Sequence, residues 1–191
     1  PTLSSAASDV YKRQSQLNAD VPARYRDPGN RWFGLTRRVR AIIVNPNLVK
    51  PSQVQTYAQL ASPALKGKVC LRNRKNVYNQ SLVADQLAIR GEAKTKACLK
   101  GMISNVSQPY FPGDIALIRA VAQGQCGVGV VNHYYLARML AGVNGARDEQ
   151  LARKVDIVMP NPAHVNISAA AVSKYATVSY THLTLPTTMW V

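Results

Sequence analysis

The fold is indicated most clearly by residues 126–141, which read CGVGVVNHYYLARMLA. The first part of this segment is almost entirely apolar, which is typical of a strand covered on both faces. From Tyr134 to Ala141 the apolar spacing is that of a short helix. We therefore expect a buried strand at 126–131 and a helix at 134–141, the building unit of an α/β protein.

The rest of the chain repeats this alternation. Apolar and β-branched runs predict strands at 38–45, 69–71, 155–159 and 165–168. Helical spacing predicts helices at 53–61, 82–90, 92–103 and 115–123, with Ser52, either Asn79 or Ser81, and Asp114 as candidate caps. This order of elements predicts an α/β fold with a mainly parallel sheet, in which ligands lie beyond the carboxyl ends of the strands.

Three tyrosines follow such strand ends. Tyr134 and Tyr135 come after the strand at 126–131, and Tyr78 comes after the strand at 69–71 and a polar loop. At a strand-to-helix turn adjacent side chains are only about 100° apart, so the paired phenols can face one point. A phenol has a pKa of about 10 and is a poor ligand while protonated, but a hard trivalent cation stabilises the phenolate. Three phenolates would balance the charge of Fe³⁺.

The residues alone leave alternatives open. The tyrosines could instead pack a core with their hydroxyl groups at the surface. Arg72 could orient a phenolate or be a solvated loop charge, and Asn132 could bind an anion or water or simply cap the helix after it. His133 is expected to point away from the tyrosine pair, and His164 is expected to form hydrogen bonds rather than bind a metal.

Cys70 and Cys126 each open a predicted strand. If these strands are neighbours in the sheet, the two residues could form a disulfide, which an oxidising compartment would permit. A buried, reduced pair of thiols is the alternative. Cys98 lies on a predicted helix and is expected to be a buried free thiol.

The composition limits the classes of function. Of 191 residues 47% are apolar, and 24 Lys and Arg against 9 Asp and Glu give a net charge of +15. No apolar run has the roughly 18–20 residues that a membrane helix needs. The basic residues are scattered without interleaved aromatics, so we interpret them as a solvated surface and not as a specific nucleic-acid site. No Ser lies in a nucleophile-elbow pattern, and Cys, His and acidic residues do not converge in one predicted loop, so nothing indicates an enzyme.

Several segments, in order and spacing, resemble bacterial periplasmic ferric-iron-binding proteins, the substrate-binding components of iron(III) ABC transporters, in the branch that relies on tyrosines. The resemblance extends over about residues 30–176. It is carried by RWFGLT (31–36), YAQLASP (57–63), KGKVC (66–70), VYNQSLVA (77–84), AVAQGQC (120–126), NHYYL (132–136) and HVNIS (164–168).

The resemblance implies a periplasmic-binding-protein type II fold of two α/β lobes joined by hinge strands. It implies that Tyr78, Tyr134 and Tyr135 are ligands of Fe(3+), and that the parent protein is a periplasmic monomer that delivers iron to an ABC permease in the inner membrane. The remaining ligands of the family, a His and/or a Tyr, would precede this chain. A binding protein for another small ligand, such as an anion or a polyamine, is the alternative, and a basic nucleic-acid-binding module is a more distant one.

The ends of the chain differ from its middle. Residues 1–14 and 178–191 lack periodicity and look like adapter sequence, so we expect them not to belong to the fold. By the resemblance, residues 15–45 are a remnant of the first lobe with a hinge strand, 46–160 form the second lobe, and 161–177 form the returning hinge strand. The chain is thus expected to be an internal fragment.

Overall fold

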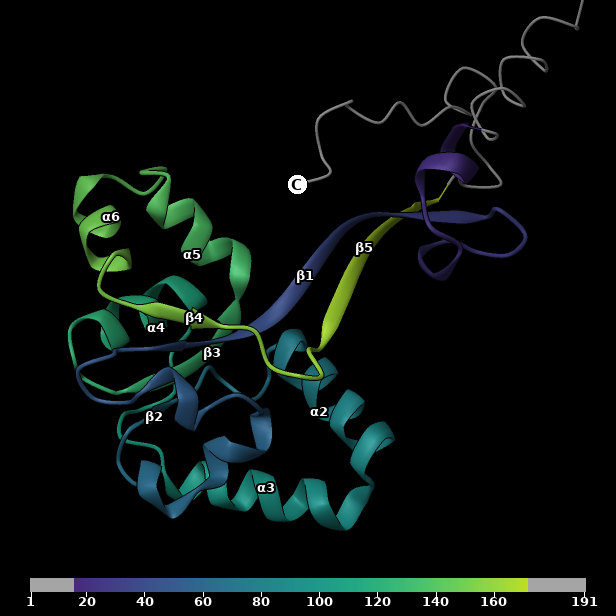
Figure 1. The fold of residues 1–191 in the computed structure, drawn as a ribbon. Helices are drawn as coiled ribbons and strands as arrows, with labels where there is room; N and C mark the ends of the chain where they lie inside the picture. Colours follow the sequence, from purple (N-terminus) through teal and green to yellow (C-terminus); the bar gives the residue numbers. More distant parts are fainter. Residues whose placement is uncertain (1–15, 172–191) are drawn as a thin grey trace, which may run out of the picture. The chain divides into compact units, whose positions relative to one another are not determined.

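The computed structural model describes residues 16–171 (Figure 1), so the adapter-like tails predicted at 1–14 and 178–191 lie outside the described residues. The chain divides into two compact units. Within the described residues, the smaller unit comprises 16–37 with 166–171 and includes a short 3-10 helix, η1 (Ala23–Tyr25). The larger unit, Arg38–Val165, contains every candidate site residue and is described by itself below.

The sheet contains β1 (Trp32–Val44), β2 (Val69–Cys70), β3 (Val128–Asn132) and β4 (Asp156–Val158) in the order β2-β3-β1-β4, and β5 (Val165–Ala171) also pairs with β1. The parallel pairing of β2 with β3 agrees with the prediction. The sheet is nevertheless mixed and not mainly parallel, because β1 lies between β3 and β4 and runs antiparallel to both. An apolar run indicates that a strand is buried but gives no information on its direction. For this reason the prediction of a mainly parallel sheet was wrong.

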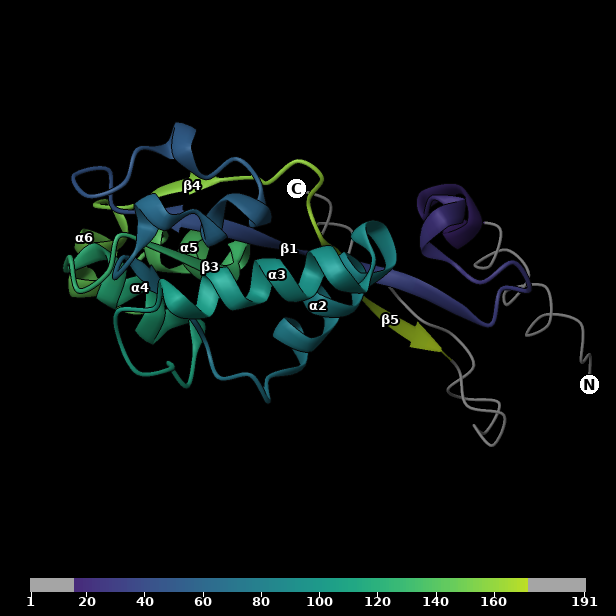
Figure 2. The same ribbon diagram turned by 90° about the horizontal axis from the view of Figure 1, so that it is seen from below.

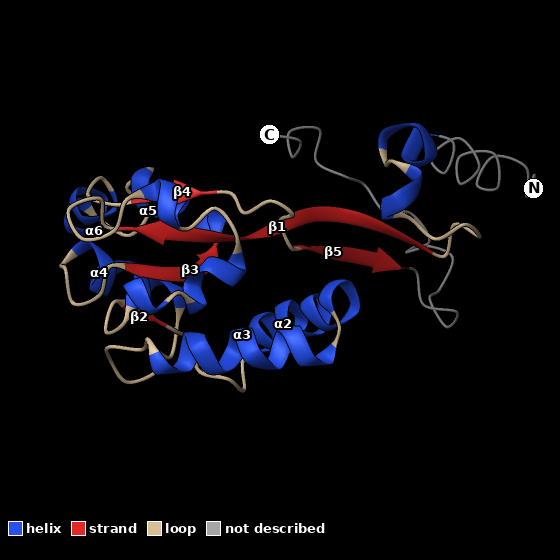
Figure 3. Ribbon diagram, turned by 60° about the horizontal axis from the view of Figure 1, so that its bottom comes forward, coloured by secondary structure: helices blue, strands red, loops and turns tan. Residues whose placement is uncertain are grey.

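Helices cover both faces of this sheet (Figures 1 and 3). α2 (Val77–Arg90) and α3 (Glu92–Ser104) lie on one face, whereas α4 (Asp114–Ala122), α5 (His133–Leu140) and α6 (Ala146–Ala152) lie on the other. Figure 2 shows α2 and α3 from below, packed against each other. The α/β class is confirmed, and none of the helices in the described part of the chain is long and apolar enough to cross a membrane.

The core follows from the alternation of side chains along β1. Ile43 belongs to the apolar cluster under α4, α5 and α6, whereas Ile42 and Val44 belong to the cluster on the face of α2 and α3. Gly129 on β3 allows α4 to approach closely, since a Cβ atom there would lie 2.3 Å from Cδ2 of Leu117. The buried strand predicted at 126–131, which the structure has as β3 at Val128–Asn132, is therefore covered on both faces.

Several helix predictions need correction. The helix expected at 53–61 is instead a set of 3-10 turns, η2 (Pro51–Gln53), η3 (Tyr57–Ala61) and η4 (Pro63–Leu65). α2 begins at Val77, where Asn76 is the capping residue in place of Asn79 or Ser81. Gly113 occupies the cap position of α4, and Asp114 provides no cap because its carboxylate is used elsewhere. α6 was not predicted.

Tyr57 on η3 forms hydrogen bonds with two segments that are distant in sequence, one around Arg40 and one around His164. Its hydroxyl donates to the backbone oxygen of Arg40 at 2.6 Å and accepts from the backbone nitrogen of His164 at 3.0 Å. Burial is the main reason that the pKa of Tyr57 rises to about 12. Because this pKa exceeds that of an unfolded tyrosine, about 10, the stabilisation is present below pH 10 and is lost as the pH rises towards 12.

We expect Tyr57→Phe to lower the free energy of unfolding by about 1–3 kcal/mol at neutral pH, since two buried hydrogen bonds disappear. The variant should also lose less stability than the parent between about pH 10 and 12. Urea denaturation followed by circular dichroism at several pH values measures both effects. Equal losses in the two proteins above pH 10 would show that Tyr57 does not govern the alkaline transition.

Candidate functional site

The three candidate tyrosines lie at the first turns of two helices. Tyr134 and Tyr135 open α5 directly after β3, with ring centroids 4.3 Å apart and planes inclined by 33°. Tyr78 is the second residue of α2, where its backbone nitrogen donates to Oδ1 of Asn76 at 2.9 Å. All three side chains are half-buried. The two segments that follow β2 and β3 thus bring their tyrosines to one region of the larger unit.

Tyr134 is the central member of this tyrosine cluster. Burial raises its pKa most, and hydrogen bonding with Tyr135 raises it further, whereas hydrogen bonding with Asn132 and Tyr78 acts to lower it. Tyr134 therefore interacts with Tyr78 from the start of α2 as well as with its own neighbour Tyr135.

Two guanidinium groups contact the ring of Tyr78. The central carbon of Arg38 lies 5.3 Å from the ring centroid, and that of Arg72 lies 5.6 Å from it. Both distances are within the range of cation–π attraction.

A buried ionic network lies beside the tyrosines. Asp114 accepts from Nη1 of Arg40 at 3.2 Å and from Nη1 of Arg72 at 2.9 Å, and the side chains of Arg40 and Asp114 are fully buried. Arg72 has a side chain only 15% exposed, so it is not a solvated loop charge. Two guanidinium groups share one carboxylate, which leaves an excess of positive charge next to the phenols. Burial is the main cause of a lowered pKa at Arg40.

Asn132 occupies the cap position of α5 but its side chain caps nothing. Its Oδ1 atom accepts from Nη1 of Arg40 at 3.2 Å, and its backbone nitrogen donates to Oδ2 of Asp114 at 2.9 Å. Its buried Nδ2 has no hydrogen-bond partner of normal geometry, yet it lies close enough to the Tyr134 hydroxyl to lower the pKa of that group. The capping interpretation is therefore wrong, because the side chain of Asn132 pairs with Arg40 instead.

The two candidate histidines point elsewhere. His133 accepts a hydrogen bond at Nδ1 from the backbone nitrogen of Val39 at 3.1 Å. His164 is buried, with Nε2 at 3.1 Å from Oγ of Ser81 and Nδ1 at 3.4 Å from Oδ1 of Asp85. Both rings are thus engaged by the fold, as expected from the sequence.

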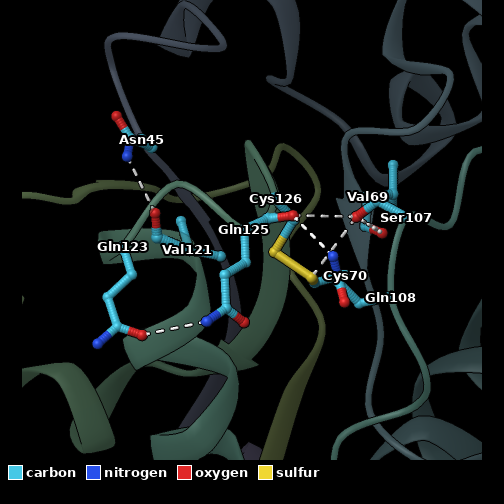
Figure 4. Close-up of a disulfide and its surroundings, with 9 residues drawn as sticks. All are labelled: Asn45, Val69, Cys70, Ser107, Gln108, Val121, Gln123, Gln125 and Cys126. Atoms are coloured by element: carbon cyan, nitrogen blue, oxygen red, sulfur yellow. Dashed lines mark hydrogen bonds between the residues drawn. A yellow bond between two sulfur atoms is a disulfide. The ribbon is translucent and has the colours of Figure 1, made fainter.

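A disulfide joins Cys70 to Cys126, with an S–S distance of 2.09 Å (Figure 4). It connects the end of β2 to the residues just before β3, the two strands that lead to the tyrosines. Both cysteines are buried, and Ser107, Gln108 and Gln125 surround them. Cys98 is a free thiol on α3 and is only partly buried.

The donor set suits a hard cation. In the described part of the chain, residues 16–171, no group of three or more His, Cys, Asp or Glu side chains is arranged to hold a metal ion. The tyrosine cluster instead offers phenol oxygens, and oxygen donors suit hard cations. A trivalent ion would also compensate the cost of deprotonating buried phenols, so the residues present fit ferric iron.

Sequence reasoning missed the role of Arg40 and treated Asp114 only as a helix cap. One signal was available, because Arg40 occupies the same strand face as Ile42 and Val44 in a run that is otherwise apolar. An arginine on a buried face requires an anionic partner. The identity of that partner could not be read from the sequence, since Asp114 lies far away along the chain.

Known proteins similar to this chain are found among curated sequences and solved structures. No family model matches the chain. Iron uptake protein A1 of Synechocystis sp. is 39% identical over 164 residues, which are 84% of this chain and 45% of that protein. The Fe(3+)-binding periplasmic protein of Serratia marcescens is 31% identical over 118 residues, 61% of this chain and 34% of that protein.

Among solved structures, an IdiA (FutA) protein of Trichodesmium in complex with iron and citrate superposes with a TM-score of 0.77 at 38% identity, covering 92% of this chain and 54% of that one. The chain thus spans about half the length of the relatives it matches. These neighbours are type II periplasmic binding proteins, which confirms the predicted fold class. Over the residues it shares with them, the chain is a homologue of bacterial iron uptake proteins and periplasmic ferric-iron-binding proteins, as the resemblance predicted.

Proposed function

We propose that this chain is part of a protein that binds ferric iron through the phenolate oxygens of Tyr78, Tyr134 and Tyr135. The observation that carries the proposal is the position of the three tyrosines at the starts of α2 and α5, where the rings of Tyr134 and Tyr135 lie 4.3 Å apart and Tyr134 interacts with Tyr78. The guanidinium groups of Arg38 and Arg72 lie over the ring of Tyr78 and place positive charge beside the tyrosines. The relatives, which include a protein solved with iron bound, support the choice of metal.

The parent protein is proposed to be a periplasmic carrier and not an enzyme. It would deliver iron to an ABC permease in the inner membrane and act as a monomer without specific affinity for nucleic acid. Residues 46–160 would form its second lobe, and 15–45 with 161–177 would contribute hinge strands and a remnant of the first. The relatives are about twice as long as the chain, so further ligands would come from the missing lobe. Lobe closure around the metal would then complete the site.

The proposal is tested with the full-length parent protein and ferric citrate at neutral pH. Phenolate ligands should give a broad visible absorption band that saturates as the site fills. The 191-residue chain alone should give a weaker band that excess citrate removes, because it supplies only part of the ligand shell. A full-length protein that stays colourless in excess ferric citrate would overturn the proposal.

Iron retention should fall as the solution is acidified. Each phenol that binds the metal must release a proton, so low pH favours the free, protonated tyrosines. The pKa of Tyr134 is raised mainly by burial, so this phenol carries its proton at neutral pH and must release it when the metal binds. We expect the apparent affinity to fall by up to about tenfold per pH unit for each phenol that must deprotonate. A citrate-competition titration between pH 6 and 8 measures this slope after correction for the protonation of citrate itself, and a flat corrected profile would contradict phenolate binding.

A further inference from the structure

Arg40 connects the two segments that carry the tyrosines. Its Nη2 atom donates to Oδ1 of Asn79 at 2.9 Å, and Asn79 is adjacent to Tyr78 at the start of α2. Its Nη1 atom donates to Oδ1 of Asn132 at 3.2 Å, and Asn132 is the last residue of β3 before α5. A planar guanidinium presents these donors in a fixed geometry. One rigid side chain therefore spans the gap between the start of α2 and the start of α5.

Asp114 is the anionic partner of Arg40 in this connection between α2 and α5. Its carboxylate accepts from Arg40, from Arg72 and from the backbone nitrogen of Asn132. Arg72 lies in the loop before α2 and contacts the ring of Tyr78. The buried carboxylate of Asp114, at the start of α4, thus binds both the loop before α2 and the end of β3.

The α2 segment is tied to the same point by Asn79. Its Nδ2 atom donates to the backbone oxygens of Arg72 and Asn73 at 2.9 and 3.3 Å, while its Oδ1 atom accepts from Arg40. The loop and the helix that follows it cannot move independently of Arg40. The position of Tyr78 relative to Tyr134 is therefore set by the same hydrogen bonds.

We propose that Arg40 and Asp114 are positioning residues for metal binding, which hold α2 and α5 at the separation that three convergent phenols require. This inference rests on the proposed function, and it assigns a role to residues that do not themselves touch the metal. Loss of an outer partner of this kind typically costs about 10–100-fold in metal affinity.

The test compares Asp114→Asn with Asp148→Asn in the full-length protein. Asp148 is a matched control, because it is also a buried carboxylate and is held by Arg119 through two bonds of 2.8 and 2.7 Å, but it does not contact the tyrosine cluster. Both variants lose an ionic partner and should be destabilised. Only Asp114→Asn should lose about 10–100-fold in ferric affinity and shift the visible band.

A readout without iron separates this inference from the proposed function. In the metal-free protein, ring resonances of labelled tyrosines should shift at Tyr78, Tyr134 and Tyr135 in Asp114→Asn and remain in place in Asp148→Asn. If the parent protein never binds iron, the proposed function fails, whereas the resonances still report whether Asp114 sets the arrangement of the rings.

Asn79→Ala covers the case in which Asp114→Asn does not fold. It removes the hydrogen bonds of Asn79 with Arg40, Arg72 and Asn73, all on the α2 side of the network, so the resonance of Tyr78 should shift while those of Tyr134 and Tyr135 stay. Unchanged ring resonances and unchanged iron affinity in Asn79→Ala, or in a folded Asp114→Asn, would overturn the inference and leave the network a purely structural role.

Discussion

Tyr135→Phe in the full-length protein should remove most of the visible absorbance that ferric iron produces and weaken iron binding by more than about 100-fold. The expected loss exceeds the 10–100-fold cost of losing an outer partner, because here a ligand atom itself disappears. Phenylalanine keeps the ring that packs at 4.3 Å from that of Tyr134, so the fold should be retained. Titration with ferric citrate, read as absorbance and as residual affinity, measures the effect.

Tyr110→Phe is the matched control, since Tyr110 is 48% exposed and lies in a loop outside the cluster. It should bind iron like the parent protein. Tyr78→Phe should behave like Tyr135→Phe, because both remove a phenol that neighbours Tyr134. If the Phe variants at positions 78 and 135 retained full iron affinity, the phenols would not be ligands, and a site that only stacks rings on a ligand would become the better interpretation.

The candidate tyrosines could be chosen from the sequence because each follows a strand that periodicity identifies. Val128–Asn132 and Val69–Cys70 are buried strands, and their parallel pairing places Tyr78 and Tyr134 beyond the same edge. The spacing of apolar residues along each strand is sufficient to choose these tyrosines, since the carboxyl ends of neighbouring parallel strands lie at the same end of the sheet.

The direction of β1 and the ionic network could not be predicted in the same way. The sequence shows an apolar run that is buried at residues 40–44, but the antiparallel insertion of β1 between β3 and β4 depends on pairings between distant segments. Asp114 looked like a helix cap because an acidic residue before an apolar helix usually is one. Its carboxylate instead forms ion pairs with Arg40 and Arg72. These ion pairs with residues distant in the sequence take precedence over the local tendency of an acidic residue to cap a helix.

The disulfide between Cys70 and Cys126 should contribute the largest single increment to the stability of the fold. It closes a loop with a sequence separation of 56 residues. The chain-entropy relation assigns about 4 kcal/mol to a loop of that length, and typical measured contributions are about 2–4 kcal/mol. The disulfide also reinforces a short pairing, because β2 consists only of Val69 and Cys70 and pairs with β3 over these two residues.

We therefore expect the double variant Cys70→Ser with Cys126→Ser to lose about 2–4 kcal/mol of unfolding free energy in urea denaturation, measured by circular dichroism. Cys98→Ser, which changes a free thiol on α3, is the control and should lose far less. Where the double variant remains folded, the two strands still lead to the same tyrosines, so its iron band should persist. Equal urea midpoints for the double variant and the parent would show that the backbone pairing of β2 with β3 is sufficient to hold β2 in the sheet without the disulfide. Loss of the band in a folded double variant would mean that the disulfide, and not the Arg40–Asp114 network alone, sets the arrangement of the phenols.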